Sequence, residues 1–185
     1  MIHIVIISSS VRTGRKSHRV ALFFKKYIEK SAKATAEIAD LNMYQFPVFN
    51  ERLKYQQDPL PGALDFAQRI KSADAVIIVT PEYNGGIPAS LKNAIDLLTD
   101  EWYKKPVAIS TVSDGHFGGS QVIISLQFSL WKIKALTVPA MFPVPKVNEV
   151  FDENGEPFDR ESTEKRAKVF IDEILNCIKA KDSMD

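Results

Sequence analysis

The stretch AVIIVTPEYNGGIPASLKNAIDLL, residues 75–98, decides the fold. It opens with an apolar, β-branched run at 75–79, which is typical of a strand buried on both faces. A loop rich in Pro, Gly, Tyr and Asn follows. An apolar stripe at helical spacing comes next, formed by Leu91, Ala94, Ile95 and Leu98. A buried strand, a loop and a helix are part of a βαβ unit, so the stretch predicts a parallel sheet.

The same alternation of strand and helix runs through the rest of the chain. Apolar or alternating runs predict four more strands, at 2–7, 35–41, 106–112 and 135–138. The run at 35–41 is less apolar than the others, so we expect it near an edge of the sheet. Helical periodicity predicts the other helices, which run from Ser17 to about 28, over 63–72, over about 121–132 and over about 160–179.

The ends of these elements carry further signals. Ser17 is the predicted N-cap of the first helix. The segments 42–62 and 139–158 contain several prolines and are predicted to be irregular, the second as a turn-rich excursion. Residues 181–185 are predicted to be a frayed tail.

This pattern predicts an α/β fold. A doubly wound, five-stranded parallel sheet in the order 2-1-3-4-5, held between two layers of helices, is the common solution. No break in composition divides the chain, so residues 1–185 are predicted to form a single domain. The order places the first and third strands side by side, with their connections on opposite faces. Loops 8–17, 80–90 and 113–120 would then meet in one crevice.

The composition narrows the class of protein. The 24 basic and 23 acidic residues leave a net charge of +1, which gives no case for nucleic acid or a membrane surface as partner. Lys25-Lys26 and Lys104-Lys105 are predicted to be solvated. The single cysteine, Cys177, excludes an internal disulfide and is predicted to be a buried, inert thiol. No run matches a secretory signal or a membrane span, so we expect a cytoplasmic protein.

The first loop combines positive charge with a helix start. Residues 8–17 carry hydroxyl groups, two arginines and a lysine in front of a helix N-terminus. The free N–H groups and partial positive charge of a helix N-terminus attract phosphate, and Arg12 adds a group suited to bidentate contact. The loop therefore predicts a phosphate site, with a hydrophilic surface loop as the alternative. It matches neither the P-loop nor the dinucleotide fingerprint.

The second and third loops offer groups for a flat ligand. Tyr83, Asn84 and the paired glycines after them can stack on a planar heterocycle and bond to its edge. The alternative is a tight turn with Tyr83 packed down. Loop 113–120 contains three glycines that let a backbone approach a ligand, and its His116 is more simply a surface residue than a proton donor.

Other catalytic patterns are missing. No His, Cys or carboxylate spacing suggests zinc, and no Gly-x-Ser-x-Gly elbow suggests a hydrolase. Glu82 and Asp96 are the carboxylates nearest the crevice, but nothing pairs them as acid and base. We expect Glu82 to orient its loop and Asp96 to form a salt bridge on its helix. The sequence therefore predicts a binding site whose chemistry a cofactor carries.

Residues 81–96, PEYNGGIPASLKNAID, closely resemble the signature of the NADPH-dependent FMN reductase family, which has a flavodoxin-like fold. Three shorter patterns add to this resemblance: Ser10-x-Arg12 with Ser17, Ser113-x-Gly115 with Gly118-Gly119, and Asp40-Leu41 with Phe46-Pro47. The sequence also departs from the family, because Ser9 stands where Gly is usual and Arg15-Lys16 resemble an insertion.

The resemblance implies bound FMN, while the residue spacing predicts no metal site. It assigns to the FMN phosphate Ser10, Arg12 and Ser17. It assigns to the isoalloxazine Pro81, Glu82, Tyr83, Asn84 and Gly85, and to its far edge Ser113 and Gly115. It names no catalytic side chain.

The resemblance also implies an activity and an assembly. The chain would take hydride from NAD(P)H and pass electrons to a small acceptor such as a quinone, free flavin, azo compound or metal oxyanion. It would form a homodimer or homotetramer, with the helix after the central loop at the interface. Two alternatives stay open: a flavodoxin-type electron carrier, and a flavodoxin-like binding module that has lost flavin. The second rests on Ser9 and Arg15-Lys16.

Overall fold

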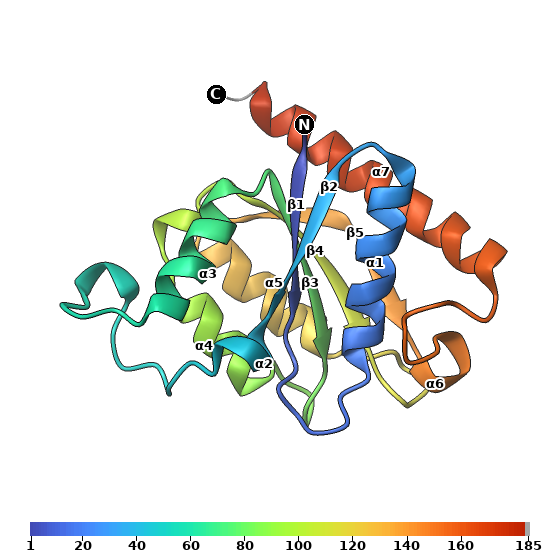
Figure 1. The fold of residues 1–185 in the computed structure, drawn as a ribbon, viewed down its shortest axis with the longest axis horizontal. Coiled ribbons are helices and arrows are strands. Elements are labelled where there is room, and N and C mark those ends of the chain that lie inside the picture. The colour runs from blue at the N-terminus through green and yellow to red at the C-terminus, as the bar shows by residue number, and fades with distance from the viewer. Residues whose placement is uncertain (184–185) are drawn as a thin grey trace.

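A computed structural model describes residues 1–183, and its sheet confirms the predicted topology. Five strands pair in parallel in the order β2-β1-β3-β4-β5. Their bounds are β1 His3–Ser8, β2 Thr35–Asp40, β3 Ala75–Pro81, β4 Pro106–Val112 and β5 Leu136–Val144. All five carboxyl ends point to one side of the molecule, the lower side in Figure 1. The connections that follow β1, β3 and β4 therefore gather on that side.

Helices cover both faces of the sheet (Figure 1). One face carries α1 Ser17–Ser31 and α7 Arg160–Asp182. The other carries α3 Pro61–Ser72, α4 Ala89–Leu97 and α5 Val122–Lys132. The short elements are α2 Leu41–Tyr44, α6 Val147–Val150 and the 3-10 turns Leu53–Tyr55 and Asp100–Trp102. No helix in the described part of the chain is long and apolar enough to cross a membrane.

The β-branched run of β3 explains why the sheet is central. Ile77 and Val79 face the layer of α1 and α7, while Val76 and Ile78 face the layer of α3, α4 and α5. All four side chains are fully buried. Because successive side chains of a strand point to opposite faces, a run without polar residues requires cover on both. Burying each such side chain contributes about 1.5–3 kcal/mol.

The observed elements differ from the predicted ones at their ends. β5 is longer than residues 135–138 and continues to Val144, although it contains two prolines. As an edge strand it tolerates proline, and its pairing with β4 shifts register between Val107 and Ile109. Ser17 is the first helical residue of α1 rather than its N-cap, a position that Lys16 holds. The helix α7 runs to Asp182, so residues 181–182 are not frayed, and residues 184–185 lie outside the described residues.

Two predictions about single side chains are wrong. Lys105 is buried, and its ammonium donates to the carbonyl oxygens of Lys71 and Ala73. Burial lowers the pKa of Lys105. Cys177 is half-buried rather than buried, and that partial burial raises the pKa of its thiol. The charge of the Lys104-Lys105 pair predicted exposure, because the sequence does not show that Lys105 packs against the C-terminal end of α3.

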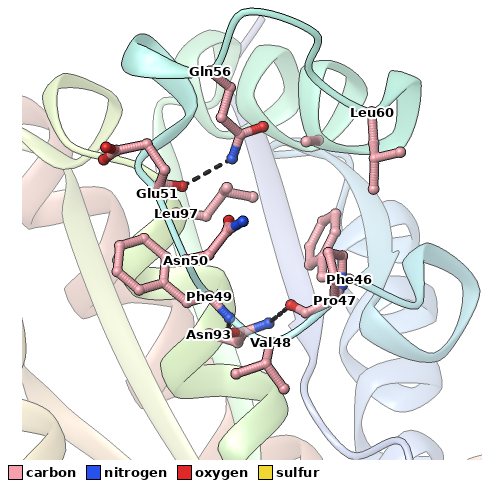
Figure 2. A pocket seen from close by; sticks show the side chains of 11 residues that line it. Phe46, Pro47, Val48, Phe49, Asn50, Glu51, Gln56, Leu60, Asn93 and Leu97 are labelled. Carbon is pink, nitrogen blue, oxygen red and sulfur yellow. Dashed lines mark hydrogen bonds between the residues drawn. The ribbon is translucent and has the colours of Figure 1, made fainter.

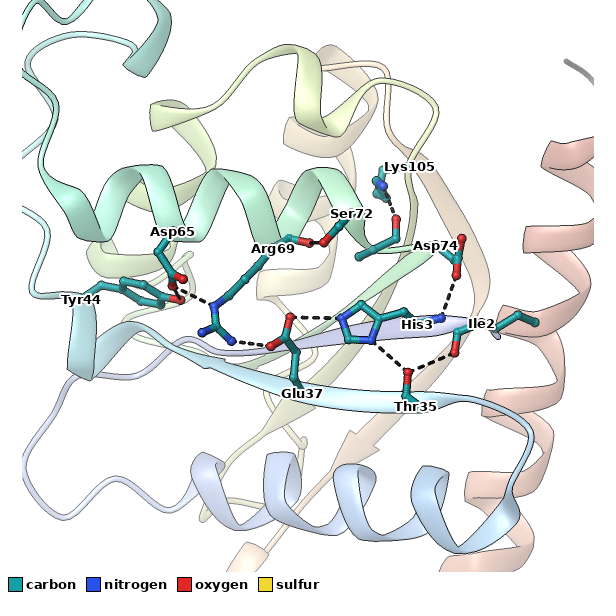
Figure 3. Close-up of polar contacts among 11 residues, drawn as sticks. Ile2, His3, Thr35, Glu37, Tyr44, Asp65, Arg69, Ser72, Asp74 and Lys105 are labelled. Atoms are coloured by element: carbon teal, nitrogen blue, oxygen red, sulfur yellow. Dashed lines mark hydrogen bonds and ion pairs between the residues drawn. The ribbon is translucent and has the colours of Figure 1, made fainter.

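A chain of polar contacts protects the edge strand β2 (Figure 3). Arg69 of α3 bonds to both Glu37 of β2 and Asp65, and Tyr44 donates to Asp65 over 2.8 Å. At the other end, a ring nitrogen of His3 lies 3.1 Å from Glu37. Charged side chains on an edge strand discourage pairing with another chain. Burial, followed by the bond to Asp65, raises the pKa of Tyr44 well above its usual value.

The hairpin after α6 depends on one glycine. Phe151 and Pro157 form an antiparallel bridge, and Gly155 at its turn has φ +77°. A Cβ there would lie 2.4 Å from the carbonyl oxygen of Arg19 and 2.9 Å from Cβ of Leu22. The turn therefore contacts α1 through a backbone without a side chain.

Gly155→Ala is expected to lower the free energy of unfolding by roughly 2–4 kcal/mol, because it adds a backbone clash to the strain of positive φ. Gly14→Ala is the matched control. Gly14 has φ +71° but nothing lies within 4 Å of a Cβ there, so only the conformational strain remains, about 1 kcal/mol. Urea unfolding of both variants measures the difference, and equal losses would refute the clash.

Candidate functional site

The three predicted loops lie together at the carboxyl ends of adjacent strands. β1 pairs with β3, and β3 pairs with β4. The loops after these strands span 9–16, 82–88 and 113–121. The connection after β1 leads to α1 on one face, and the connection after β3 leads to α4 on the other. Such a switch point is where open α/β sheets bind ligands.

The first loop leaves polar groups without partners. Ser9 Oγ and Ser17 Oγ are buried and have no hydrogen-bond partner within residues 1–183. No side chain caps the N-terminus of α1, and the Arg19 N–H bonds to the Lys16 carbonyl over 3.1 Å, so the Ser17 and His18 N–H groups are the ones without a partner within residues 1–183. The exposed Arg12 side chain has no ion pair among the described residues. Buried orphan hydroxyls, an uncapped helix and a free guanidinium fit an anion such as phosphate.

The other arginine of this loop turns away from the crevice. Arg15 donates to the carbonyl oxygen of Ser10 over 2.8 Å and forms a two-pronged contact with the carboxylate of Asp40, at the end of β2. Burial would raise the pKa of Asp40, but hydrogen bonds from Arg15 and from the Asn42 N–H together lower it. His18 lies beside this pair, 2.9 Å from Ser8 Oγ, and burial lowers the pKa of its imidazole.

The second loop is a tight turn with free backbone donors. Tyr83 and Gly86 exchange backbone hydrogen bonds of 3.2 and 3.0 Å. Between them Asn84 and Gly85 have φ of 50° and 76°, as a two-residue hairpin turn requires. Their own N–H groups make no hydrogen bond among residues 1–183 and are exposed. These are donors for the polar edge of a flat ligand.

Tyr83 connects the second loop to the first. Its hydroxyl lies 2.7 Å from Ser10 Oγ, and the Ser90 hydroxyl donates to the Ser9 carbonyl over 2.7 Å. Tyr83 is half-buried, so part of its ring remains accessible. The turn and the ring-stacking surface were alternatives on sequence grounds. The structure contains the turn, with Tyr83 half-buried and its hydroxyl bonded to the first loop, and the ring-stacking surface stays a prediction.

Glu82 connects the second loop to α5. Its carboxylate accepts from the Gln121 N–H over 2.8 Å, at the start of that helix. A carboxylate at a helix N-terminus is stabilised by the helix dipole. A Cβ on Gly119 would lie 3.5 Å from Glu82 Cβ, so the two loops touch here. Pro81 is the last residue of β3 and positions Glu82.

The third loop is tied to its neighbours by its backbone. Ser113 Oγ donates to the Gly115 carbonyl over 3.0 Å, and the same carbonyl accepts from the Lys146 N–H. Asp114 accepts from Lys16 over 2.8 Å, which joins the third loop to the first. His116 is exposed, as expected of a surface residue.

A fourth segment, 45–60, borders the crevice without having been predicted there. Asn93 of α4 clamps it, because its amide donates to the Pro47 carbonyl and accepts from the Phe49 N–H (Figure 2). The pocket drawn in Figure 2 borders this segment and is small, with a volume of ≈ 30 Å³. A larger hollow of ≈ 360 Å³, which Phe46 and Asn93 also line, reaches Val11 of the first loop and Ser90. Asn93 belongs to the signature, but its spacing carried no signal of this contact.

The carboxylates near the crevice have structural partners. Glu82 bonds to α5, and Asp96 forms an ion pair with Lys92 on its own helix, as expected. No group of three His, Cys, Asp or Glu residues that could hold a metal occurs in residues 1–183. The arrangement offers groups suited to a phosphate, backbone N–H donors and an aromatic side chain. These features are typical of a cofactor-binding oxidoreductase with the flavodoxin-like fold.

Comparisons with known proteins agree with this class. The family model described as NADPH-dependent FMN reductase matches residues 2–149. The NAD(P)H-dependent FMN reductase LOT6 of Saccharomyces cerevisiae is 34% identical over 142 residues, covering 70% of this chain and 73% of the relative. The quinone reductase of Escherichia coli K12 is 32% identical over 168 residues, covering 86% of each chain.

A solved structure is also similar. The NAD(P)H:acceptor oxidoreductase FerB from Paracoccus denitrificans superposes with a TM-score of 0.77 at 25% identity, covering 98% of this chain and 99% of the other. The chain belongs to the NADPH-dependent FMN reductase family. The resemblance of its central signature is thereby confirmed, and so is its assignment to oxidoreductases that use FMN and NADPH.

Asp40→Asn is expected to change how stability depends on pH. Because the pKa of Asp40 is lowered in the folded state, its contribution is complete above the unfolded value of about 3.9 and is lost as the pH falls through the folded pKa. The variant should lose roughly 1–3 kcal/mol at pH 7 and show a shallower decline as the pH falls below about 4. Asp114→Asn, which breaks an exposed pair, should cost less than about 1 kcal/mol. Urea unfolding across this pH range measures both, and parallel curves for Asp40→Asn and the parent would contradict the assignment.

Proposed function

We propose that this protein binds FMN in the crevice formed by the three loops and oxidises NAD(P)H, passing the electrons to a small acceptor such as a quinone. The observation that carries the proposal is the buried, unpartnered hydroxyl of Ser17 at the uncapped start of α1. A buried polar group without a partner costs about 1–3 kcal/mol, and of the three such hydroxyls, those of Ser9, Ser17 and Thr111, only Ser17 lies at a helix N-terminus, where an anionic ligand is favoured. Membership of the NADPH-dependent FMN reductase family supports the same ligand.

The first loop would hold the phosphate. Ser17 Oγ and the free N–H groups of the first turn of α1 supply neutral donors, and Arg12 supplies the charge. Ser10 contributes its hydroxyl, which also contacts Tyr83 and thus connects the phosphate end to the ring end. The serine at position 9 is compatible with this loop, because its side chain is fully buried beneath it.

The second and third loops would hold the ring. Tyr83 supplies an aromatic edge, and the N–H groups of Asn84 and Gly85 supply donors at the turn. Pro81 and Glu82 fix the start of this turn against β3 and α5. Ser113 and Gly115 border the far side, where their backbone is fixed to the segment before α6.

FMN supplies the redox chemistry when bound, because its ring accepts a hydride from a nicotinamide and gives electrons to an acceptor. The chain's own residues bind and orient. Glu82 and Asp96 each have a structural partner, so we assign neither of them a proton-transfer role. The contact between Ser10 and Tyr83 joins the first loop to the second, and the contact between Lys16 and Asp114 joins it to the third. These contacts keep the three loops at fixed positions around the crevice. Holding two reactants in a fixed geometry is the protein's contribution to rate.

The direct test uses the purified chain loaded with FMN. We expect a yellow protein that retains FMN on gel filtration and oxidises NADPH or NADH when benzoquinone is added. Comparing the two nicotinamides and a panel of a quinone, an azo dye and chromate identifies the preferred substrates. A reduced flavin semiquinone that accumulates without nicotinamide turnover would instead favour an electron carrier. A colourless protein that cannot be loaded with FMN would refute flavin binding.

Ser17→Ala tests the phosphate site with little risk to the fold. Because Ser17 Oγ is buried without a partner, its removal is expected to raise the free energy of unfolding of the FMN-free chain by about 1–3 kcal/mol. The affinity for FMN should fall about tenfold, the value of one hydrogen bond to a charged group. Ser110→Ala is the matched control, since Ser110 Oγ donates to the buried Phe142 carbonyl over 2.8 Å. It should cost about 1 kcal/mol of stability and leave FMN binding unchanged. The reverse pattern would refute the assignment.

The partner of this chain is proposed to be a second copy. An apolar stripe on α5 is exposed, with Ile124 at 76%, Phe128 at 61% and Trp131 at 66%. These positions share one side of the helix, and large exposed apolar patches mark interaction sites. The family resemblance placed the interface on α4, but the exposed positions of α4 carry Ala89 and Lys92. We therefore place it on the neighbouring α5, where a two-fold axis would bring the stripe against itself.

Phe128→Lys is expected to convert the proposed homodimer to a monomer, because it sets two like charges in the centre of an apolar contact. Light scattering coupled to gel filtration measures the mass. Val169→Lys is the control, since Val169 is 67% exposed on α7, which covers the opposite face of the sheet. A parent chain that is monomeric at micromolar concentration would contradict the proposal.

A further inference from the structure

We propose that Arg15 is a positioning residue for the FMN phosphate: it fixes the shape of the phosphate loop through Ser10 and Asp40 without touching the phosphate itself. The inference rests on the proposed function, since it concerns the affinity for FMN. It gives a role to a residue that the sequence showed only as part of an insertion.

The geometry of the guanidinium carries the first step. One terminal nitrogen donates to the Ser10 carbonyl over 2.8 Å and to one oxygen of Asp40, and the other donates to the second oxygen over 2.5 Å. The side chains of Arg15 and Asp40 are only 16% and 14% exposed. Both terminal nitrogens are therefore engaged on the β2 side of the loop. Arg12, by contrast, is exposed and has no ion pair among residues 1–183.

The contact between Arg15 and the Ser10 carbonyl fixes the backbone of the first loop at Ser10. The Ser10 carbonyl is turned toward Arg15, so that its partial negative charge does not face an incoming phosphate. Ser10 Oγ is then 2.7 Å from the Tyr83 hydroxyl and 3.4 Å from the Arg12 N–H. The Arg15 guanidinium thus fixes the orientation of Ser10. The hydroxyl of Ser10 is proposed to bind the phosphate, and it also contacts the backbone N–H of Arg12. A loop already in its bound shape loses less conformational entropy on binding.

The third step concerns Asp40. Its carboxylate ends β2 next to β1, and it also accepts from the Asn42 N–H over 3.0 Å. Without Arg15 an unpaired, half-buried carboxylate would remain beside the phosphate loop, at high cost. Arg15 neutralises that charge, and through Arg15 the Asp40 carboxylate holds the Ser10 backbone in place. His18, 3.8 Å from Asp40, is the other titratable group on this carboxylate.

The alternative is that Arg15 contacts the phosphate directly. The two possibilities predict opposite changes in the affinity of Asp40→Asn for FMN. If Arg15 positions the loop, Asp40→Asn loosens it and weakens FMN binding, even though the variant removes a negative charge. If Arg15 binds phosphate directly, the same variant releases the guanidinium and strengthens FMN binding. Riboflavin lacks the phosphate, so it reports on the ring site alone.

The experiment measures dissociation constants for FMN and riboflavin by quenching of flavin fluorescence. It uses the parent chain, Arg15→Ala, Arg15→Lys, Asp40→Asn and Arg69→Ala. Arg69→Ala is the matched control, because Arg69 forms a comparable bridge from α3 to Glu37 on the same strand, β2 (Figure 3). Riboflavin binding also confirms that each variant is folded.

We expect Arg15→Ala and Asp40→Asn to weaken FMN binding about tenfold or more, with riboflavin changed less than about twofold. Arg15→Lys should restore part of the loss, because a lysine replaces the charge but not the two-pronged contact. Arg69→Ala should bind both flavins as the parent does.

Three outcomes overturn the inference. Unchanged FMN binding in Arg15→Ala removes the role, and tighter FMN binding in Asp40→Asn assigns Arg15 to the phosphate instead. Equal losses for FMN and riboflavin show general damage to the fold. A parent chain that binds neither flavin refutes this inference and the proposed function together, whereas a parent that binds FMN with unaffected variants refutes this inference alone.

Discussion

The parallel pairing of β1 with β3 is the constraint on which the rest of the structure depends. Its register runs from Ile4 opposite Ala75 to Ser8 opposite Val79, so the two strands end together. The loop after β1 and the loop after β3 must then start side by side, although 73 residues separate Ser10 from Tyr83 along the chain. Because each strand is buried on both faces, a slip in this register would expose apolar side chains. The core therefore fixes the geometry of the crevice.

The loops depend on that frame but are held by polar contacts of their own. Tyr83 links the second loop to the first, Lys16 links the first to the third, and Glu82 links the second to α5. Each contact joins two loops that follow different strands, so the crevice is preorganised only when those strands are paired. Three buried hydroxyls have no partner within residues 1–183: Ser9 and Ser17 at the two ends of the first loop, and Thr111 in β4.

The chemistry of the site follows from what these contacts leave free. The nearby carboxylates bond to a helix start or to a neighbouring lysine, and His116 is exposed and forms no hydrogen bond or ion pair within residues 1–183. What remains without a partner is the N–H groups of Asn84 and Gly85, the buried hydroxyls of the first loop and the exposed guanidinium of Arg12. A protein with this equipment binds a reactive group and leaves the electron chemistry to it. Membership of the NADPH-dependent FMN reductase family agrees with that division of labour.

The sequence by itself determined the sheet order, the positions of the three loops and the family. β-branched runs with loops between them leave few topologies, and the signature at 81–96 is long enough to be specific. It did not determine the length of β5, where Pro139 is tolerated only because the strand lies at an edge. Nor did it reveal the burial of Lys105 or the roles of Asn93 and Arg15. An arginine has the same charge wherever it lies, and only the end of β2 brings Asp40 within reach of Arg15. Contacts between residues far apart in sequence have no local signature. The tertiary structure alone therefore decided that Arg12 is exposed without an ion pair within residues 1–183, while Arg15 bonds to Asp40 and to the loop backbone.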